Sequence, residues 1–217
     1  MPQITPEPGT AVHVQLVIER LRQAHPDAHC ELNYETPLQL LIAVILSAQC
    51  TDVRVNQVTP ALFARYQTVA DFAGANRAEL EAIIHPTGFF RQKARFIQVC
   101  CHRLLHVYGG EVPDNIADLI TLTGVARKTA NVVLGEIYGI AEGITVDTHI
   151  KRLSGRLGWS DGKSPYKVEK DLMQIIPKES WIEIAHLLIF HGRRVCDARK
   201  PDCPNCILND ICPSADL

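Results

Sequence analysis

The chain has 217 residues, enough for one large domain or two small ones, and its apolar content of 47% and charged content of 21% are typical of a soluble globular protein. The formal net charge of −2 gives no overall basic signature for a nucleic-acid partner, although binding depends on where charges lie. The N-terminus has no basic region or apolar run, and the longest apolar run, LQLLIAVIL, is too short to span a bilayer. We therefore expect no signal peptide, no membrane partner and a reducing, cytoplasmic location.

The first predicted elements are helices, because apolar residues recur with helical spacing and no segment has the period of two that marks a strand. After a loose lead-in of ten residues, the first helix is predicted over 12–25. Residues 36–49 open with a Thr-Pro start signal and are apolar on nearly every face, which predicts the central helix of a bundle. Residues 51–66 begin with a Thr-Asp cap, and Pro60 should bend or restart this helix.

Helices are also predicted along the rest of the chain, over residues 77–84, 92–108, 115–122, 127–138, 165–176 and 179–191. Asp147 is expected to cap a further helix within the segment GITVDTHIKRLSGRLG. The connections are short, and none is long enough to separate two independent domains. The predicted fold class is therefore all-α.

The eight cysteines fall into two groups. Four are scattered among apolar residues and are predicted to be small buried side chains: Cys30, Cys50, Cys100 and Cys101. The other four crowd into 17 residues with a C-x6-C-x2-C-x5-C spacing: Cys196, Cys203, Cys206 and Cys212. Thiolates bind soft metals, and ligands that surround a centre singly favour a [4Fe-4S] cluster over zinc, whose sites use two separated pairs. Disulfides rank third, because the compartment is predicted to be reducing.

Positive side chains surround the first two cysteines of this tail. They are Arg193, Arg194, Arg199 and Lys200, with Asp197 as the one acid among them. A metal-shaped loop that presents cations indicates an anionic binding partner. The same sequence leaves open whether the cluster is a redox centre or holds the loop in shape.

The segment LTGVARKTANVV places a turn around Gly124 between two predicted helices. Backbone N–H groups of such a turn can hold a phosphate, although plain packing of two helices explains the segment equally well. Lys128 lies near the start of the second helix, where the positive end of the dipole favours the free amine and hence a nucleophile. Alternatively, Lys128 could be a solvated lysine that pairs with a phosphate, and this role is compatible with that of a nucleophile. Asp147, beyond capping its helix, could stabilise an oxocarbenium-like transition state and assist proton transfer.

Together, the hairpin with its lysine, the segment VDTHI and the cysteine spacing resemble the endonuclease III family of DNA glycosylases, in the helix-hairpin-helix superfamily. The resemblance covers most of the chain, from ELNYETPLQLLIAVILSAQCTD to the last cysteine. It implies a six-helix domain over residues 30–140, with the helix-hairpin-helix at about 115–134, and an iron–sulfur domain from residues 10–29 plus 141–217. It further implies a monomer that binds double-stranded DNA with damaged bases or abasic sites, associated with the nucleoid if bacterial.

The resemblance also implies residue roles. Lys128 attacks the sugar C1′ of a flipped-out nucleotide, Asp147 assists, and β-elimination of the resulting imine nicks the strand on the 3′ side. The substrates implied are oxidised or ring-saturated pyrimidines and abasic sites. Gln49 in SAQCTD corresponds to the glutamine that fills the space left by the flipped base, and Phe89 in TGFFRQKARF corresponds to the wedge inserted into the stack. Further implied DNA contacts are Gly124, Ala126, His149 and Arg193.

Alternatives remain at several positions. Thr123 and Ala126 stand where the family commonly has proline and glycine, Phe89 could fill the core, and His149 could be a structural histidine.

No acidic residue occurs between Ala82 and Gly110, and this stretch forms a local basic stripe expected to contact phosphates: Arg91, Lys93, Arg95 and Arg103.

Two other functions fit parts of the pattern. An adenine-mismatch glycosylase shares the fold and the cluster but lacks the lysine, and a non-catalytic iron–sulfur protein could bind DNA or sense redox state. The presence of both Lys128 and Asp147 favours the bifunctional enzyme.

Overall fold

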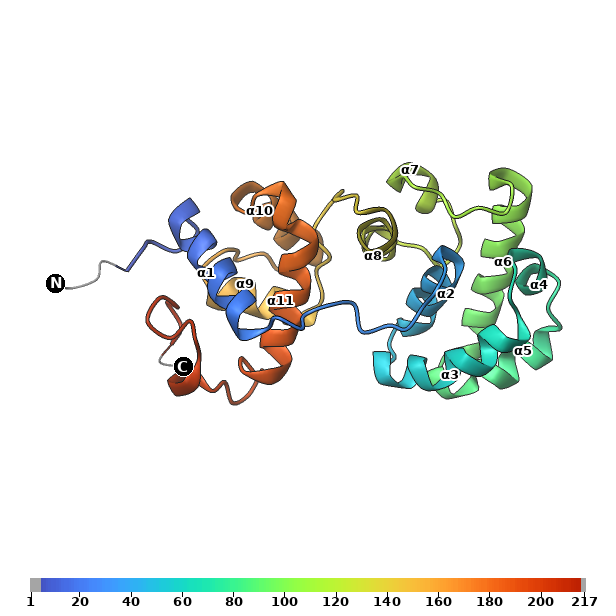
Figure 1. The fold of residues 1–217 in the computed structure, drawn as a ribbon, viewed down its shortest axis with the longest axis horizontal. Helices are drawn as coiled ribbons and strands as arrows, with labels where there is room; N and C mark the ends of the chain where they lie inside the picture. Colours follow the sequence, from blue (N-terminus) through green and yellow to red (C-terminus); the bar gives the residue numbers. More distant parts are fainter. Residues whose placement is uncertain (1–4, 216–217) are drawn as a thin grey trace. The chain divides into compact units, whose positions relative to one another are not determined.

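The computed structural model describes residues 5–215, and over that range the chain forms eleven α-helices and short 3-10 turns, with no strand (Figure 1). The prediction of an all-α fold is confirmed. None of the helices in this range is long and apolar enough to cross a membrane. Residues 1–4 of the predicted lead-in lie outside the described part of the chain.

The chain divides into two compact units: residues 31–142 form one, and the segments before Glu31 and after Glu142 together form the other. In unit 31–142 the central element is α2, Pro37–Ser47, which starts as predicted because Thr36 accepts a hydrogen bond from the Gln39 backbone. Eight of its eleven residues are buried. It packs against α3 (Asp52–Arg65), α6 (Phe90–Tyr108) and α8 (Arg127–Tyr138), which confirms its predicted central position.

The remaining helices of this unit are shorter. They are α4 (Val69–Ala73), α5 (Arg77–Ile84) and α7 (Ile116–Leu119), with a 3-10 turn at His85–Thr87 between α5 and α6. Two predictions differ in detail from the structure: no new helix starts at Pro60, and α7 is shorter than predicted. Helix α3 continues through Pro60 without restarting, because the residue is exposed while Val58 and Leu62 on either side of it are buried and hold both halves in place. Helix α7 ends at Leu119 rather than at residue 122, so the connection to α8 is longer than predicted.

The second unit contains α1 (Ala11–Ala24), α9 (Thr148–Arg156), α10 (Pro165–Ile175) and α11 (Trp181–Arg194), with 3-10 turns at Lys178–Ser180 and Cys203–Asn205. Its core draws apolar side chains from both ends of the chain. Val17 and Leu21 of α1 lie in the same buried cluster as Leu208 and Ile211 of the cysteine tail. The early and late segments therefore share one core.

Polar contacts join α1 to the tail as well. His13 is fully buried, and its Nδ1 lies 3.1 Å from the indole Nε1 of Trp159 while its Nε2 lies 3.1 Å from the carbonyl oxygen of Ile211. Because an indole N–H can only donate, Nδ1 accepts and Nε2–H donates to the carbonyl. Arg20 of α1 donates to the carbonyl of Ile207, 2.9 Å away, and forms an ion pair with Asp210.

Candidate functional site

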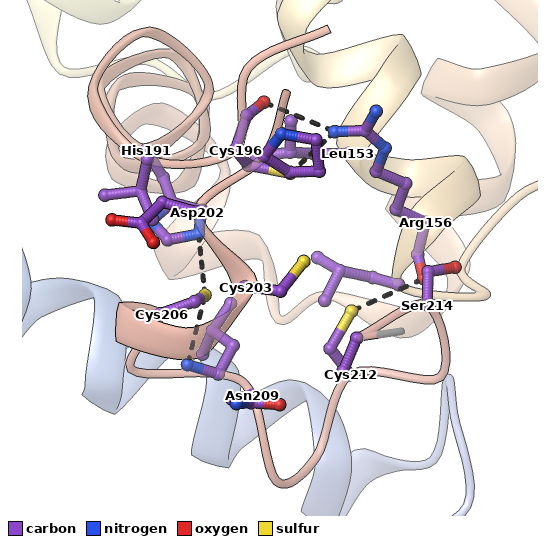
Figure 2. Close-up of a pocket in the computed structure, with 15 residues that line it drawn as sticks. Leu153, Arg156, His191, Cys196, Asp202, Cys203, Cys206, Asn209, Cys212 and Ser214 are labelled. Carbon is purple, nitrogen blue, oxygen red and sulfur yellow. Dashed lines mark hydrogen bonds between the residues drawn. The ribbon is translucent and has the colours of Figure 1, made fainter. Parts of the chain in front are cut away.

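All four cysteines of the tail line one pocket in the second unit (Figure 2). Its walls are largely apolar, with Leu153 and Leu157 from α9 and its end, Val195 after α11, and Leu208 from the tail. Burial raises the pKa of Cys206 and Cys212, so these thiols keep their protons until a metal displaces them. The predicted metal-binding residues are therefore brought together around one space.

Hydrogen-bond donors point at two of the sulfur atoms. Arg156 Nη1 lies 3.1 Å from Cys196 Sγ, and the backbone N–H of Leu208 lies 3.4 Å from Cys206 Sγ. His191 Nε2 also lies 3.4 Å from Cys206 Sγ. Donors of this kind stabilise thiolates that bind iron. The four thiols and these donors therefore fit an iron–sulfur cluster.

A second histidine, His25, contacts His191 on the ring nitrogen that does not face Cys206. His25 Nε2 and His191 Nδ1 are 3.1 Å apart, and both rings are buried. Burial, with a smaller contribution from His25, lowers the pKa of His191 to about 4, so the imidazole is neutral near pH 7. If His25 donates to Nδ1, His191 carries its proton on Nε2 and can donate to Cys206.

Two arginines of α9 hold the loop that carries the first cysteine. Arg152 Nη2 donates to the carbonyls of Gly192 and Cys196, at 2.8 and 2.9 Å. Arg156 donates to the carbonyls of Asp197 and Ala198, at 2.7 and 3.0 Å. The cysteine loop is thus fastened to the helix that Asp147 caps.

Other polar residues near the cysteines serve the loop itself. Arg194, one of the four cations predicted to face an anionic partner, forms an exposed ion pair with Asp27 at 2.7 Å and covers the Phe190 ring. Asp197 accepts hydrogen bonds from the backbones of Arg199 and Lys200 and closes the turn. Arg193, a predicted DNA contact, is exposed on the last turn of α11.

The hairpin between α7 and α8 presents Lys128 to solvent. Gly124 has a φ of +87°, and a Cβ there would lie 3.1 Å from the Phe96 side chain, so a glycine is required on both counts. Ala126 has an extended backbone with φ −91°, which explains how alanine replaces the usual glycine without strain. Lys128 is the second residue of α8 and is exposed.

The N-termini of α6 and α8 differ from the others in unit 31–142. Side chains cap α2, α3, α4, α5 and α7, whereas the residues preceding α6 and α8 are Phe89 and Ala126, which make no side-chain cap bond. No capping side chain therefore occupies the N-terminus of either helix. Helix N-termini of this kind favour phosphate.

Asp147 is the N-cap of α9, as predicted. Its Oδ1 accepts a 2.8 Å hydrogen bond from the backbone of Ile150, and the residue is half-buried. Two positions further on, His149 Nδ1 accepts from Arg152 Nη2 at 3.2 Å. The ring lies against Gly192, where a Cβ would come within 3.0 Å of it.

Gln49 and Phe89 share an unusual backbone. Among residues 5–215 they are the non-glycine residues with positive φ, at +54° and +47°. Each such conformation costs on the order of 1–3 kcal/mol and is typical of functional loops. Both side chains are exposed, and Phe89 is 61% exposed, which excludes the alternative that it fills the core.

The predicted basic stripe includes one residue, Lys93, that does not reach the surface. Lys93 is only 3% exposed, so it cannot contact phosphate as Arg91 and Arg95 can, both of which are exposed. Two of the four scattered cysteines also differ from expectation: Cys100 and Cys101 are buried, whereas Cys30 and Cys50 are half-buried.

Known proteins resemble this chain over nearly its whole length. Residues 42–178 match the HhH-GPD superfamily of base excision DNA repair proteins. The chain is 52% identical to endonuclease III of Synechocystis sp. over 205 residues, covering 94% of this chain and 92% of the relative. It is 42% identical to endonuclease III of Escherichia coli strain K12 over 196 residues, covering 90% and 92%.

The chain belongs to the endonuclease III family. It is therefore a base excision repair DNA glycosylase of the glycosylase and abasic-site lyase type. A solved structure described as a trapped endonuclease III–DNA covalent intermediate has a TM-score of 0.89 with this chain at 46% identity. The match covers 95% of this chain and 97% of that one.

For this endonuclease III family member, sequence reasoning missed the residues that support the cysteines and the loops. The spacing of Arg152 and Arg156 could have indicated a shared role, because residues four positions apart lie on the same face of a helix. His191 precedes Cys196 by five residues and could have been suspected for that reason. The burial of Lys93 had no local signal.

Proposed function

We propose that this endonuclease III family enzyme removes oxidised pyrimidines from double-stranded DNA and then cleaves the abasic strand. The observation that carries the proposal is the exposed amine of Lys128, the second residue of α8, directly after a hairpin whose second helix has no side-chain cap. An amine in that place can attack sugar carbon while the neighbouring N–H groups hold a phosphate of the same strand.

The proposed chemistry uses the two predicted catalytic residues. The neutral Lys128 amine attacks C1′, the bond from C1′ to the base breaks, and the base leaves with the bonding electrons and gains a proton. The Asp147 carboxylate stabilises positive charge developing on the sugar and assists proton transfer, through Oδ2, since capping occupies Oδ1. The nitrogen then loses a proton, the bond from C1′ to O4′ breaks, and O4′ takes the bonding electrons and a proton, which opens the sugar ring and leaves an imine. The imine loses a C2′ proton, and the bond from C3′ to its phosphate oxygen breaks with its electrons leaving on the phosphate, which nicks the strand.

The damaged nucleotide has to leave the stack before an amine can reach C1′. We propose that Gln49 fills the vacated space and that Phe89 enters the stack as a wedge. Their exposure and their left-handed backbone support this assignment. Gly124, Ala126, His149 and Arg193 are proposed as further contacts to DNA.

We also propose that Cys196, Cys203, Cys206 and Cys212 hold a [4Fe-4S] cluster. Four thiols around one largely apolar pocket, with N–H donors directed at two sulfurs, support a polynuclear group with separate ligand positions. When bound, such a group supplies cross-linking of the tail and one-electron chemistry. The unit built from α1, α9, α10 and α11 is accordingly proposed as the iron–sulfur domain, and a cytoplasmic location suits its thiols.

Borohydride trapping tests the proposed reaction. The protein is incubated with a duplex that has one abasic site, and borohydride reduces any imine to a stable secondary amine. We expect one covalent protein–DNA product that depends on both borohydride and the abasic site. Absence of the product with protein that contains its iron would disprove the lyase mechanism. The adenine-mismatch and non-catalytic alternatives both predict no adduct, and the endonuclease III relatives do not favour them.

Replacing Arg156 by methionine tests the support of the cluster. The change removes the donor to Cys196 Sγ and the contacts to the carbonyls of Asp197 and Ala198, so the first ligand loop loosens. We expect a chelator to bleach the visible iron–sulfur absorbance roughly tenfold faster than in the unchanged protein, since supporting hydrogen bonds around a metal are typically worth 10- to 100-fold in affinity.

Arg22→Met is the matched control for this change. It breaks an exposed ion pair with Glu183 in the same unit, and such pairs contribute about 0–1 kcal/mol to stability. Equal bleaching rates in the two variants would show that Arg156 does not support the cluster. Stoichiometric zinc without iron in the purified protein would overturn the cluster assignment itself.

A further inference from the structure

Lys93 is a buried lysine in the first turns of α6, within unit 31–142. Its Nζ donates one hydrogen bond of 2.7 Å to the carbonyl of Leu46 and another of 2.8 Å to the carbonyl of Thr87. Both bonds are buried, and burial lowers the pKa of the lysine. A single side chain therefore joins two segments that are 41 residues apart in sequence (87 minus 46).

These two carbonyls stand at the bases of the two strained loops. Leu46 lies in the last turn of α2, three residues before Gln49, and Thr87 ends the 3-10 turn two residues before Phe89. Gln49 and Phe89 are the two non-glycine residues with positive φ in the described part of the chain. One ammonium group thus anchors both described segments that have a left-handed non-glycine residue.

Core packing alone does not explain a lysine in this position. Burying an amine is costly, and an apolar side chain of similar length would fill the same space without desolvating a charge. The carbonyl of Leu46, at the negative end of the α2 dipole, offsets part of this cost. What an apolar residue could not do is hold two backbone carbonyls at a fixed separation.

We propose that Lys93 is a positioning residue that holds Gln49 and Phe89 together in the geometry for insertion into DNA. This inference rests on the proposed roles of these two residues in base extrusion. Preorganised loops bind more tightly because less conformational freedom is lost on association. Lys93 contributes through the loops and not through a phosphate, since its side chain is only 3% exposed.

The test compares Lys93→Met with the unchanged protein on two duplexes, one undamaged and one with a stable tetrahydrofuran abasic analogue. We expect affinity for the abasic duplex to fall about tenfold, the loss expected from removing buried hydrogen bonds to a charged donor. Affinity for undamaged duplex and the slope of log affinity against log salt should stay unchanged. A slope that falls by about one would mean a lost phosphate contact and would overturn the proposal.

A double-mutant cycle separates positioning from general weakening. Gln49→Ala with Phe89→Ala removes both inserting side chains, and Lys93→Met is then added to that background. Because Lys93 acts through these side chains, the added change should cost less than about twofold in affinity for the abasic duplex. A full tenfold loss in both backgrounds would contradict the proposal.

Two controls accompany the cycle. Lys170→Met removes the same formal charge from an exposed lysine of the other unit and should leave both affinities unchanged. If thermal unfolding shows that Lys93→Met does not fold, Lys93→Gln, whose amide can still donate to one carbonyl, replaces it in the same cycle. Retention of full affinity by a folded Lys93→Met, or by Lys93→Gln where it takes the place of Lys93→Met, would overturn the proposal.

The outcomes also separate this inference from the proposed function. If Gln49→Ala and Phe89→Ala leave affinity for the abasic duplex unchanged, the insertion roles fail whatever Lys93 does. If those changes weaken binding but Lys93→Met behaves additively, the inference about Lys93 alone fails. Borohydride trapping tests the imine step independently of both.

Discussion

Lys128→Ala is expected to abolish the borohydride-trapped adduct and to lower base excision on the order of a thousandfold or more, since the change removes the proposed nucleophile. Lys128 is exposed at the start of α8, and substitutions at such positions usually change stability by no more than about 0.5 kcal/mol. Thermal unfolding and visible absorbance should therefore match those of the unchanged protein. The measurements are adduct yield on a denaturing gel and single-turnover excision of an oxidised pyrimidine.

Lys128→Arg separates the loss of the nucleophile from the loss of positive charge. Arginine keeps the positive charge next to the hairpin but remains protonated in proteins, so it cannot form an imine. We expect affinity for abasic duplex close to that of the unchanged protein and no adduct. An adduct from Lys128→Arg or Lys128→Ala would assign the nucleophile to another amine.

Asp147→Asn is expected to lower excision by roughly 10²- to 10⁴-fold while leaving the fold and DNA affinity intact. Asparagine caps helices as well as aspartate does, so α9 keeps the hydrogen bond that Oδ1 now accepts from Ile150. The loss should therefore reflect the missing negative charge. Single-turnover rates with an oxidised pyrimidine measure it, and turnover like that of the unchanged protein would remove Asp147 from the mechanism.

Two further variants separate chemistry from capping. Asp147→Ala loses both the charge and the cap, and it should lower stability by about 0.5–2 kcal/mol in addition to the loss of activity. Ser164→Ala removes the cap of α10, a bond to the Lys167 backbone in the same unit, without touching the proposed site. It should lower stability by a similar amount and leave excision unchanged.

Much of the fold could be predicted from the sequence where local signals agree. The boundaries of α5 and α8 match those predicted, and α2 was placed at the centre because its apolar residues cover nearly every face. Helix α4 was missed because five residues give no period, although Thr68 and Asp71 form a capping box that marks its start. No new helix starts at Pro60, and Val58 and Leu62 on either side of it are buried.

The site was less accessible to sequence reasoning. Motif spacing could place the four cysteines, Lys128 and Asp147, because each belongs to a compact pattern. The left-handed backbone at Gln49 and Phe89 follows from how α2 and α6 are held, which no local pattern expresses. The sequence predicts Lys93 to be a surface cation. Its burial is evident only in the structure, where it donates to the carbonyls of Leu46 in α2 and Thr87 in the 3-10 turn.

The shared core of α1 and the cysteine tail has a consequence for synthesis on the ribosome. Residues 31–142 emerge as one continuous stretch and can begin to fold while later residues are still being added. Helix α1 is made first, yet its partners Leu208 and Ile211 are nearly the last described residues to appear. The unit that carries Asp147 and the cysteines is thus completed only after Leu208 and Ile211 have been added, so a chain terminated before residue 208 lacks the shared core.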